Sequence, residues 1–244
     1  MMVAGESRNV LIVLANPEPG SFCHALANAA YRALTAAGHS VELSDLYAQG
    51  FNPVAGRHDF TTVADPARFH YQSEQAKAAR EDGFSAEIAR EQARVRKADN
   101  LILIFPLWWG AAPAMLKGWL ERVLAYGVAY VDGARFDTGL LRGRRAMICV
   151  TTGGTPERFS PQGVYGPIEN ILYPVQRLGL EYMGFVTEQP FVAYAAPRVS
   201  GEARQQMLAE FGEKAVAMAA LDVDPYQPPC HPLDLVEAGA WSRS

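Results

Sequence analysis

The feature that most constrains this fold is a repeated alternation between apolar, β-branched runs and helical segments. Continuous apolar runs occur at residues 10–16, 100–107 and 144–154, and further strand-like runs occur at 40–47 and 185–194. A continuous apolar run is typical of a strand that is covered on both faces, as in a parallel sheet. The run at 40–47 alternates instead, which favours a strand nearer the edge.

Helical periodicity fills the intervals between these runs. The predicted helices are residues 22–38, 113–125, 168–180 and 201–220. Gly38 is placed to end the first helix, Pro113 fits the first turn of the second, and Pro174 interrupts the third. Alternating strands and helices predict an α/β fold, a doubly wound, five-stranded parallel sheet in the order 2-1-3-4-5 with helices on both faces.

The composition is compatible with a single domain over residues 1–244. Hydrophobic residues make up 49% of the chain and charged residues 20%, so a sizeable core is expected. Two segments are not needed to build the predicted five-stranded fold, namely 52–84 and the Pro-rich tail 222–244. Long excursions from a compact domain usually have a function. We therefore expect both to act as arms that pack on a second copy of the chain.

Charge and hydropathy exclude several classes of partner. The net charge of -4 offers no electrostatic attraction to nucleic acid or to an anionic membrane. The most apolar stretch, residues 101–116, is too short to span a bilayer and is broken by Pro106, Gly110 and Pro113. No secretory signal is recognised at the N-terminus. We expect a soluble, cytoplasmic protein.

Cysteine and histidine give no sign of a metal site. Cys23, Cys149 and Cys230 lie far apart, and their odd number suits a reducing compartment rather than a disulfide framework. The five histidines show no metal-ligand spacing on one helix face. We therefore expect no bound metal.

Three loops follow the predicted strands at the edge where their carboxyl ends meet. The first, "NPEPGSF", leads into a helix at Ser21 and offers backbone N–H groups to an anion. The second, "PLWWGAAP" at 106–113, places two tryptophans beside small residues. The third, 151–167, begins with "TTGG" and exposes the amides of Gly153 and Gly154. Each loop, taken alone, is also compatible with an ordinary structural turn.

Taken together, the three loops favour a flavin site. An anion-binding helix start suits a phosphate, and an aromatic wall suits the face of a planar ring. Unencumbered amides suit the carbonyl edge of a heterocycle, where they stabilise negative charge. No Ser-His-Asp set, paired carboxylates or P-loop competes with this interpretation.

These stretches resemble a known family. The segments "LIVLANPEPGSF", "SDLYAQGFNPVAGRHDF", "FPLWWGAAPAMLKGWLERVL", "TTGG" and "QGVYG" closely resemble the NAD(P)H:quinone oxidoreductase (DT-diaphorase-like) family of the flavodoxin-like superfamily. The resemblance runs from about Asn9 through the last helix and reaches "PLDLVEAG" in the tail. It implies a homodimer with FAD in each subunit, and FMN is the less favoured cofactor. It also implies that NAD(P)H donates a hydride that passes through the flavin to a quinone.

The resemblance implies roles for individual residues. The cofactor-binding set that it implies is Asn16, Ser21, Phe22, Cys23, His70, Pro106, Leu107, Trp108, Trp109, Thr151, Thr152, Gly153, Gly154, Phe159 and Arg204. The substrate-binding set comprises Trp109, Tyr130, Asp132, Phe159 and Tyr165. Tyr165 and the amides of Gly153 and Gly154 are the candidate catalytic groups.

Several positions depart from the family pattern. Asn16, Cys23 and His70 stand where histidine, asparagine and glutamine are usual. Phe159 and Tyr165 replace a tyrosine and histidine pair beside the flavin, so Tyr165 and the glycine amides remain to neutralise charge there. Arg177 and Glu181 occupy the positions of the histidines in the metal site of mammalian relatives.

We therefore predict an FAD-dependent NAD(P)H:quinone oxidoreductase that transfers two electrons by a ping-pong mechanism. One alternative is a reductase of azo, nitro or pathway-specific quinonoid substrates, because Gly110 and Asp132 could enlarge or polarise the pocket. The other is a flavin-binding electron carrier with little turnover. A carrier needs an exposed flavin edge, whereas the pocket aromatics favour a closed site.

Overall fold

A single parallel sheet forms the centre of the molecule. The computed structural model describes residues 6–236, and its strands lie in the order β2-β1-β3-β4-β5, with β6 also paired to β4. The strands are β1 (Asn9–Leu14), β2 (Ser40–Asp45), β3 (Asn100–Pro106), β4 (Arg145–Thr151), β5 (Val186–Thr187) and β6 (Phe191–Ala193). Every pairing is parallel. The predicted sheet order and doubly wound architecture are confirmed.

The central strands β1, β3 and β4 are largely apolar because both faces of the sheet are covered there, whereas β2 at the edge is mostly polar. Along β1, Val10 and Ile12 pack in one core cluster, whereas Leu11 and Val13 pack in the other. Successive side chains of a strand point to opposite faces, so a continuous apolar sequence supplies two cores at once. All seven residues of β3 are buried.

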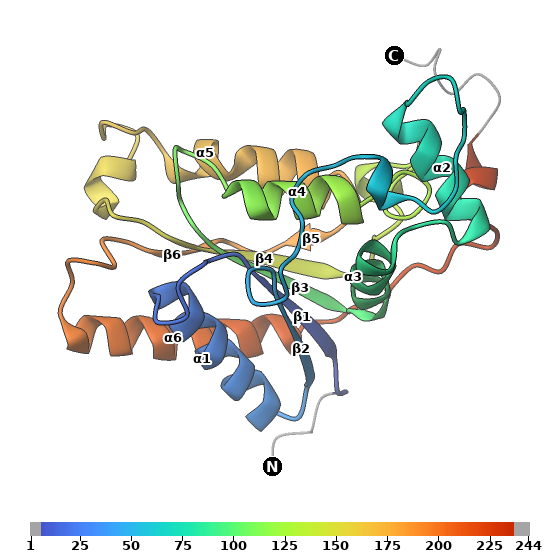
Figure 1. Ribbon diagram of the computed structural model, residues 1–244. Helices are drawn as coiled ribbons and strands as arrows, with labels where there is room; N and C mark the ends of the chain where they lie inside the picture. The colour runs from blue at the N-terminus through green and yellow to red at the C-terminus, as the bar shows by residue number, and fades with distance from the viewer. Residues whose placement is uncertain (1–5, 237–244) are drawn as a thin grey trace.

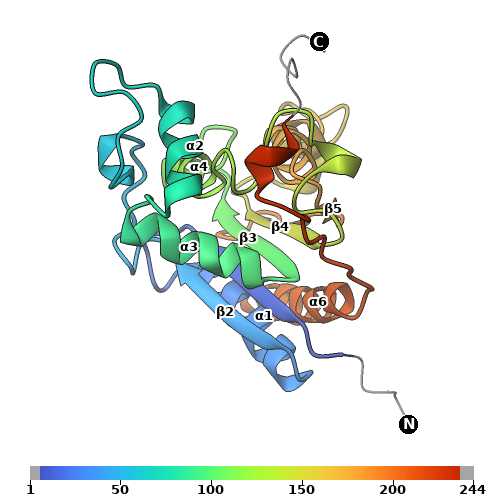
Figure 2. The same ribbon diagram turned by 90° about the vertical axis from the view of Figure 1, so that its right-hand side faces the viewer.

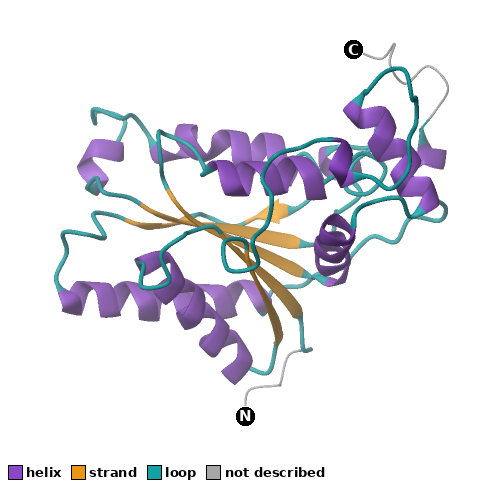
Figure 3. Ribbon diagram, in the orientation of Figure 1, coloured by secondary structure: helices purple, strands orange, loops and turns teal. Residues whose placement is uncertain are grey.

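The helices form one layer on each side of the sheet (Figure 1, Figure 3). Helices α1 (Phe22–Ala36) and α6 (Gly201–Ala219) cover one face; α3 (Ala86–Lys97), α4 (Ala114–Val123) and α5 (Ile168–Val175) cover the other. Figure 2 shows the same separation from the side. Within residues 6–236, none of the helices combines the length and the hydropathy that a membrane span requires.

Two predicted elements differ in detail. The single strand expected at 185–194 is divided into β5 and β6, with Pro190 immediately before β6. Proline has no N–H to donate to a ladder, which explains an interruption there. The helix predicted at 168–180 with an interruption at Pro174 is divided one residue later: α5 ends at Val175, and the chain continues as the π-helix η4 (Gln176–Glu181).

The segment 52–84 is more regular than the sequence indicates. It contains the short 3₁₀ helix η1 (Arg57–Asp59) and the helix α2 (Tyr71–Glu81), and α3 follows it; neither α-helix was predicted. The segment is joined to α4 by Arg122, whose buried guanidinium donates to Asp59 Oδ1 and to the carbonyl of Asn52. Removing one partner of such a buried ion pair costs about 3–5 kcal/mol. The segment is therefore anchored on its own chain.

The tail also packs on its own chain, as far as residue 236. Asp234 pairs with Arg80 of α2 at 2.8 Å, and His231 Nε2 lies 3.0 Å from the carbonyl of Ala79. Figure 1 shows the tail's short helix beside α2. Residues 237–244 of the expected arm lie outside the described residues. The role of both segments at a dimer interface stays a prediction.

The remaining short helices connect these elements. They are the 3₁₀ helices η2 (Phe136–Thr138), η3 (Pro156–Phe159) and η5 (Pro232–Leu235). Of these, η3 matters most for function because it belongs to the loop that follows β4.

Candidate functional site

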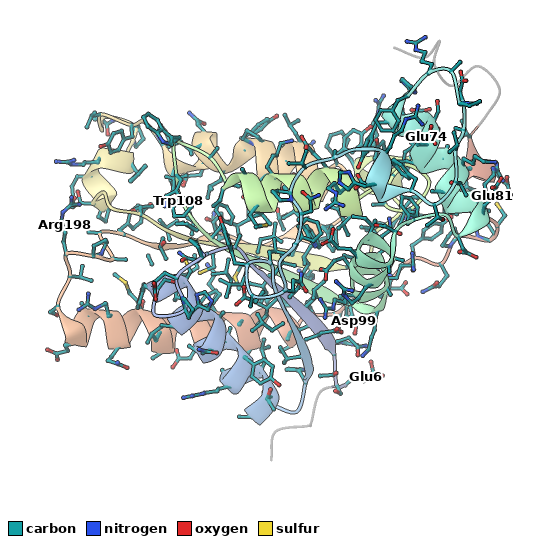
Figure 4. The ribbon with its side chains drawn as sticks, viewed as in Figure 1. Glu6, Glu74, Glu81, Asp99, Trp108 and Arg198 are labelled. Atoms are coloured by element: carbon teal, nitrogen blue, oxygen red, sulfur yellow. The ribbon has the colours of Figure 1, made fainter. Side chains whose placement is uncertain are left out.

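Two adjoining cavities lie where the loops after β1, β3 and β4 meet. The first has a volume of about 760 Å³ and the second about 600 Å³, and both are lined by Leu107, Thr152 and Gly153. Figure 4 shows Trp108 and Arg198 at this end of the molecule and Glu74 and Glu81 at the opposite end. This is the edge where a doubly wound sheet binds its ligands. We call the first the phosphate-side cavity and the second the aromatic cavity.

Most of the predicted site residues line these two cavities. Those in the phosphate-side cavity are Asn16, Ser21, Phe22, Cys23, Pro106, Leu107, Trp108, Thr151, Thr152, Gly153 and Arg204. Those in the aromatic cavity are Leu107, Trp109, Thr152, Gly153, Gly154, Phe159 and Tyr165. The structure thus brings together residues from loops that are far apart in sequence.

The loop after β1 is held by hydrogen bonds within itself. Asn16 Oδ1 accepts from the N–H of Glu18 at 2.9 Å, and Glu18 Oε1 accepts from the N–H of Gly20 at 2.8 Å. The N–H of Ser21 donates to the carbonyl of Glu18 at 2.9 Å. Such local bonds fix a loop in one conformation.

The start of α1 presents unpaired N–H groups to the phosphate-side cavity. Ser21 caps the helix by accepting from the N–H of His24. The first N–H groups of a helix have no partner within it, and those of Phe22 and Cys23 donate to no other residue within 6–236. Together with the helix dipole, they give the start of α1 the chemistry that suits an anion.

Cys23 lies beneath this cavity as an uncharged thiol. Its side chain is buried, with Sγ 3.4 Å from Thr151 Oγ1. Burial raises the pKa of the Cys23 thiol, although hydrogen bonds with Thr151 and Asn16 partly oppose the rise. The floor of the cavity therefore carries no thiolate to repel an anion at neutral pH.

The loop after β3 forms a tight turn in an unfavourable conformation. Trp108 and Ala111 exchange two backbone hydrogen bonds, at 3.1 and 3.0 Å, and Trp109 and Gly110 occupy the two central positions. Both have positive φ, 49° and 68°. Glycine adopts this region freely, whereas a bulky residue there is strained. The side chain of Trp109 is also fully exposed, so packing of that side chain on residues 6–236 does not offset the strain.

The turn after β4 places two glycines at the border of the cavities. The carbonyl of Gly154 accepts from Thr152 Oγ1 and from the N–H of Ala195, both at 2.8 Å. The N–H groups of Gly153 and Gly154 donate to no described residue. A side chain at Gly154 would approach the Phe159 ring to 2.7 Å, so glycine is required for this packing.

Phe159 and Tyr165 form one wall of the aromatic cavity. Their ring centroids are 5.0 Å apart; Phe159 is buried, and Tyr165 is half exposed. The N–H of Tyr165 donates to the carbonyl of Arg158 at 3.0 Å. This bond holds Tyr165 beside the Gly154 amide, where a Cβ at Gly154 would lie 3.4 Å from its ring.

Three predicted site residues do not reach these cavities. His70 caps α2 through Ser73, and α2 lies at the end of the molecule opposite Trp108 (Figure 4). Tyr130 lines a separate apolar cavity of about 440 Å³ beside α4. Asp132 accepts a hydrogen bond from Tyr126 Oη at 2.8 Å. Within one chain, none of the three is among the residues that line the aromatic cavity.

Two charged residues that line the aromatic cavity were not singled out from the sequence. Arg158 and Arg198 border the aromatic cavity, and the Arg198 guanidinium donates to the carbonyl of Gly153. Arg158 lies in η3, within the loop after β4 that the sequence had already indicated. Arg198 lies in the loop that precedes α6. The sequence signal that could have identified Arg158 was a cationic residue close to the glycine pair.

Arg177 and Glu181 stand where mammalian relatives have the histidines of a metal site. Arg177 and Glu181 form an ion pair at 2.8 Å on the π-helix, rather than a pair of metal ligands. Across the described residues, no group of three His, Cys, Asp or Glu side chains is arranged to hold a metal ion.

Comparison with known proteins identifies the family. A family described as having a flavodoxin-like fold matches residues 8–215. NAD(P)H dehydrogenase (quinone) 1 from Cavia porcellus is 40% identical over 203 residues, which are 83% of this chain and 74% of that protein. The human ribosyldihydronicotinamide dehydrogenase (quinone) is 39% identical over 208 residues, covering 85% and 90%.

A solved structure agrees with these relatives. The crystal structure of a candidate quinone reductase from Klebsiella pneumoniae is similar with a TM-score of 0.83 and 36% identity, covering 90% of this chain and 87% of that one. The chain therefore belongs to the flavodoxin-like family of oxidoreductases that includes the NAD(P)H dehydrogenases (quinone).

Proposed function

We propose that this protein is an FAD-dependent NAD(P)H:quinone oxidoreductase that transfers two electrons by a ping-pong mechanism. The observation that supports this most is the set of unpaired backbone N–H groups that border two adjoining cavities, two from Phe22 and Cys23 and two from Gly153 and Gly154. The relatives named NAD(P)H dehydrogenase (quinone) supply the reaction class.

The phosphate-side cavity fits the diphosphate part of FAD. Ser21, Phe22 and Cys23 would bind phosphate oxygens at the start of α1, where the helix dipole favours negative charge. Arg204 lines the opposite wall from α6 and would add a charge-assisted hydrogen bond. The cavity volume of about 760 Å³ lies in the range of cofactor sites.

The aromatic cavity fits the ring system and the substrates that react with it. A flavin bound there supplies the hydride-transfer chemistry. Trp109 and Phe159 would provide flat apolar surfaces. The N–H groups of Gly153 and Gly154 and the hydroxyl of Tyr165 would donate hydrogen bonds to the pyrimidine edge and stabilise negative charge that develops there.

We further propose that the working unit is a homodimer with the site at its interface. In one chain, Trp109 is fully exposed, and Tyr130, Asp132 and His70 lie away from the aromatic cavity. A partner subunit would supply these three residues and cover Trp109. The apolar cavity beside α4, bordered by the exposed Leu178, is a surface suited to such burial.

The cytoplasm is the compartment that we propose for this enzyme. Cys23, Cys149 and Cys230 are all free, and Cys230 is exposed. An exposed free thiol is typical of a reducing environment.

The cofactor is tested by an absorption spectrum of the purified protein and chromatography of the flavin released by heat. FAD is the expected product. Release of FMN alone, or no flavin after incubation with FAD, would contradict the assignment.

The reaction is tested by stopped-flow spectroscopy. NAD(P)H should bleach the flavin absorption in one phase, and a quinone added afterwards should restore it. Flavin reduction that takes minutes, and is therefore too slow for enzymatic turnover, would instead indicate an electron carrier. Light scattering tests the dimer, because an active 26.6 kDa monomer at assay concentrations contradicts it.

A further inference from the structure

The aromatic cavity carries an uncompensated positive charge. Among the residues that the structure describes, Arg158 and Arg198 are the only charged ones that line it, and no acidic residue of 6–236 is among its lining. The adjoining phosphate-side cavity likewise contains one charged residue, Arg204. This local excess contrasts with a chain whose net charge is -4.

The two guanidinium groups are available to a ligand. Neither forms an ion pair with a carboxylate of residues 6–236. The Arg158 side chain donates no hydrogen bond within that range, and Arg198 uses one N–H on the carbonyl of Gly153. Both side chains are exposed at the mouth of the cavity, in contrast to the buried Arg122, which pairs with both Asp59 and Glu87.

The remaining lining determines what kind of anion fits. Trp109, Phe159 and Tyr165 provide flat surfaces that suit an aromatic ring. A guanidinium presents a planar fork of donors that matches a carboxylate. Arg158 stands in η3, and Arg198 precedes α6, so the two cations reach the cavity from separate loops. An aromatic ring with a carboxylate substituent satisfies both features.

We propose that the preferred electron acceptor of this enzyme is an aromatic quinone that bears a carboxylate, and that Arg158 and Arg198 bind this group. The proposal rests on the proposed function and specifies its acceptor. The quinone gains two electrons and two protons, supplied as a hydride from NAD(P)H and a proton from water. The carboxylate takes no part in the chemistry and serves only for binding.

The test compares two acceptors that differ in one charge, 1,4-naphthoquinone and 1,4-naphthoquinone-6-carboxylate. The readout is the ratio of kcat/KM for the carboxylate to that for the neutral quinone, measured at saturating NAD(P)H. Arg158→Gln and Arg198→Gln should each lower this ratio about tenfold, and the double variant about a hundredfold, because each removes one charge-assisted contact. Arg32→Gln is the matched control, because Arg32 is exposed on α1 and lines neither cavity.

A second measurement needs no turnover. Isothermal titration of the oxidised protein with naphthalene-2-carboxylate should give a dissociation constant that rises about tenfold in each variant. Binding should also weaken with added salt. Naphthalene-2-carboxamide, which has the same shape without the charge, should bind both variants as it binds the native protein.

Three results would overturn the proposal. The first is an equal loss of kcat/KM for both quinones, which would place the arginines in flavin binding or folding. The second is a loss confined to flavin reduction by NAD(P)H, which would assign them to the dinucleotide phosphates. The third is carboxylate binding that the substitutions leave unchanged. If NAD(P)H does not reduce the native protein, the proposed function fails, and the titration still tests the arginines.

Discussion

The loops after β1 and β3 end at the same edge of the sheet, yet they are built in opposite ways. The β1 loop is stabilised by its own hydrogen bonds, through Asn16, Glu18 and Ser21, and leads directly into a capped helix. The β3 loop also has two internal hydrogen bonds, between Trp108 and Ala111, yet it holds Trp109 at positive φ with its side chain fully exposed. The β1 loop therefore has a favourable backbone conformation in the isolated chain, whereas the β3 loop has an unfavourable one at Trp109.

This difference corresponds to two kinds of ligand. A pre-ordered loop binds a permanent ligand with little loss of conformational entropy, which suits the phosphates of a resident cofactor. Strain at a residue persists when it serves function, and it concentrates where ligands bind. We infer that the β1 side retains the cofactor, whereas the aromatic side carries out the exchange of substrates.

The largest effect expected from this division of roles is on the aromatic side. Tyr165→Phe keeps the ring and removes the hydroxyl that would donate to the pyrimidine edge. It should slow flavin reduction by NAD(P)H roughly ten- to a thousandfold, the scale of a lost oxyanion-type donor. Stopped-flow measurement of the reductive half-reaction gives the rate, and the flavin should stay bound.

Tyr173→Phe is the matched control for this variant. Tyr173 is as exposed as Tyr165 but lies on α5 and lines neither site cavity. A Tyr165→Phe enzyme that is reduced at the native rate would assign the donor role to the amides of Gly153 and Gly154 alone.

The converse result is expected on the phosphate side. Arg204→Gln should weaken FAD binding roughly ten- to a hundredfold, because it removes a charge-assisted hydrogen bond. Once saturated with FAD, the variant should be reduced at the native rate. Fluorescence titration of the flavin-free protein measures the affinity, and slower reduction of the saturated variant would show that the two sides are not separate in function.

Much of the fold follows from the sequence because its central strands β1, β3 and β4 are largely continuous apolar runs. Helices α2 and α3 were missed because polar residues carry their packing. Glu91 of α3 is fully buried and accepts hydrogen bonds from Ser44 Oγ and Trp119 Nε1. A buried carboxylate makes a helix resemble a solvated segment, so hydrophobic periodicity does not reveal it.

The candidate site was predictable where it depends on loops at one sheet edge. Parallel strands bring their carboxyl ends together whatever the lengths of the connections, so Ser21, Trp108 and Gly153 could be grouped from sequence. Tyr130 and His70 could not be placed in this way. Tyr130 lies in the loop after α4, and His70 lies in the long connection after β2, and strand order does not fix the path of either segment. Strand order also gives no information on contacts with a second subunit.

A smaller effect is expected when the helix cap is removed. Ser21→Ala should lower the free energy of unfolding by about 1 kcal/mol through loss of the α1 cap, and FAD should raise the melting temperature less than in the native protein. Ser200→Ala removes the equivalent cap of α6 at a residue that lines neither cavity. Both variants should lose similar stability, but only Ser21→Ala should lose part of the stabilisation by FAD.

The smallest effect, and the one of opposite sign, is expected at Trp109. Asparagine tolerates the left-handed region, and Trp109 makes no buried contact in the chain that its loss would sacrifice. Trp109→Asn should therefore raise the free energy of unfolding by about 1 kcal/mol and the melting temperature by about 2–4 °C. Thermal unfolding of the flavin-free protein at concentrations below dimer formation measures this gain.

Trp109→Phe separates backbone strain from the aromatic surface. Phenylalanine keeps a ring and the unfavourable φ of 49°, so it should not stabilise the chain, and it should retain most of the quinone turnover. Trp109→Asn should be more stable and slower with quinone, because asparagine tolerates this φ but has no aromatic ring to present to the substrate. If Trp109→Asn gains no stability, or gains it without losing turnover, then the β3 loop is not strained for function. The contrast between the two loops would then be one of geometry alone.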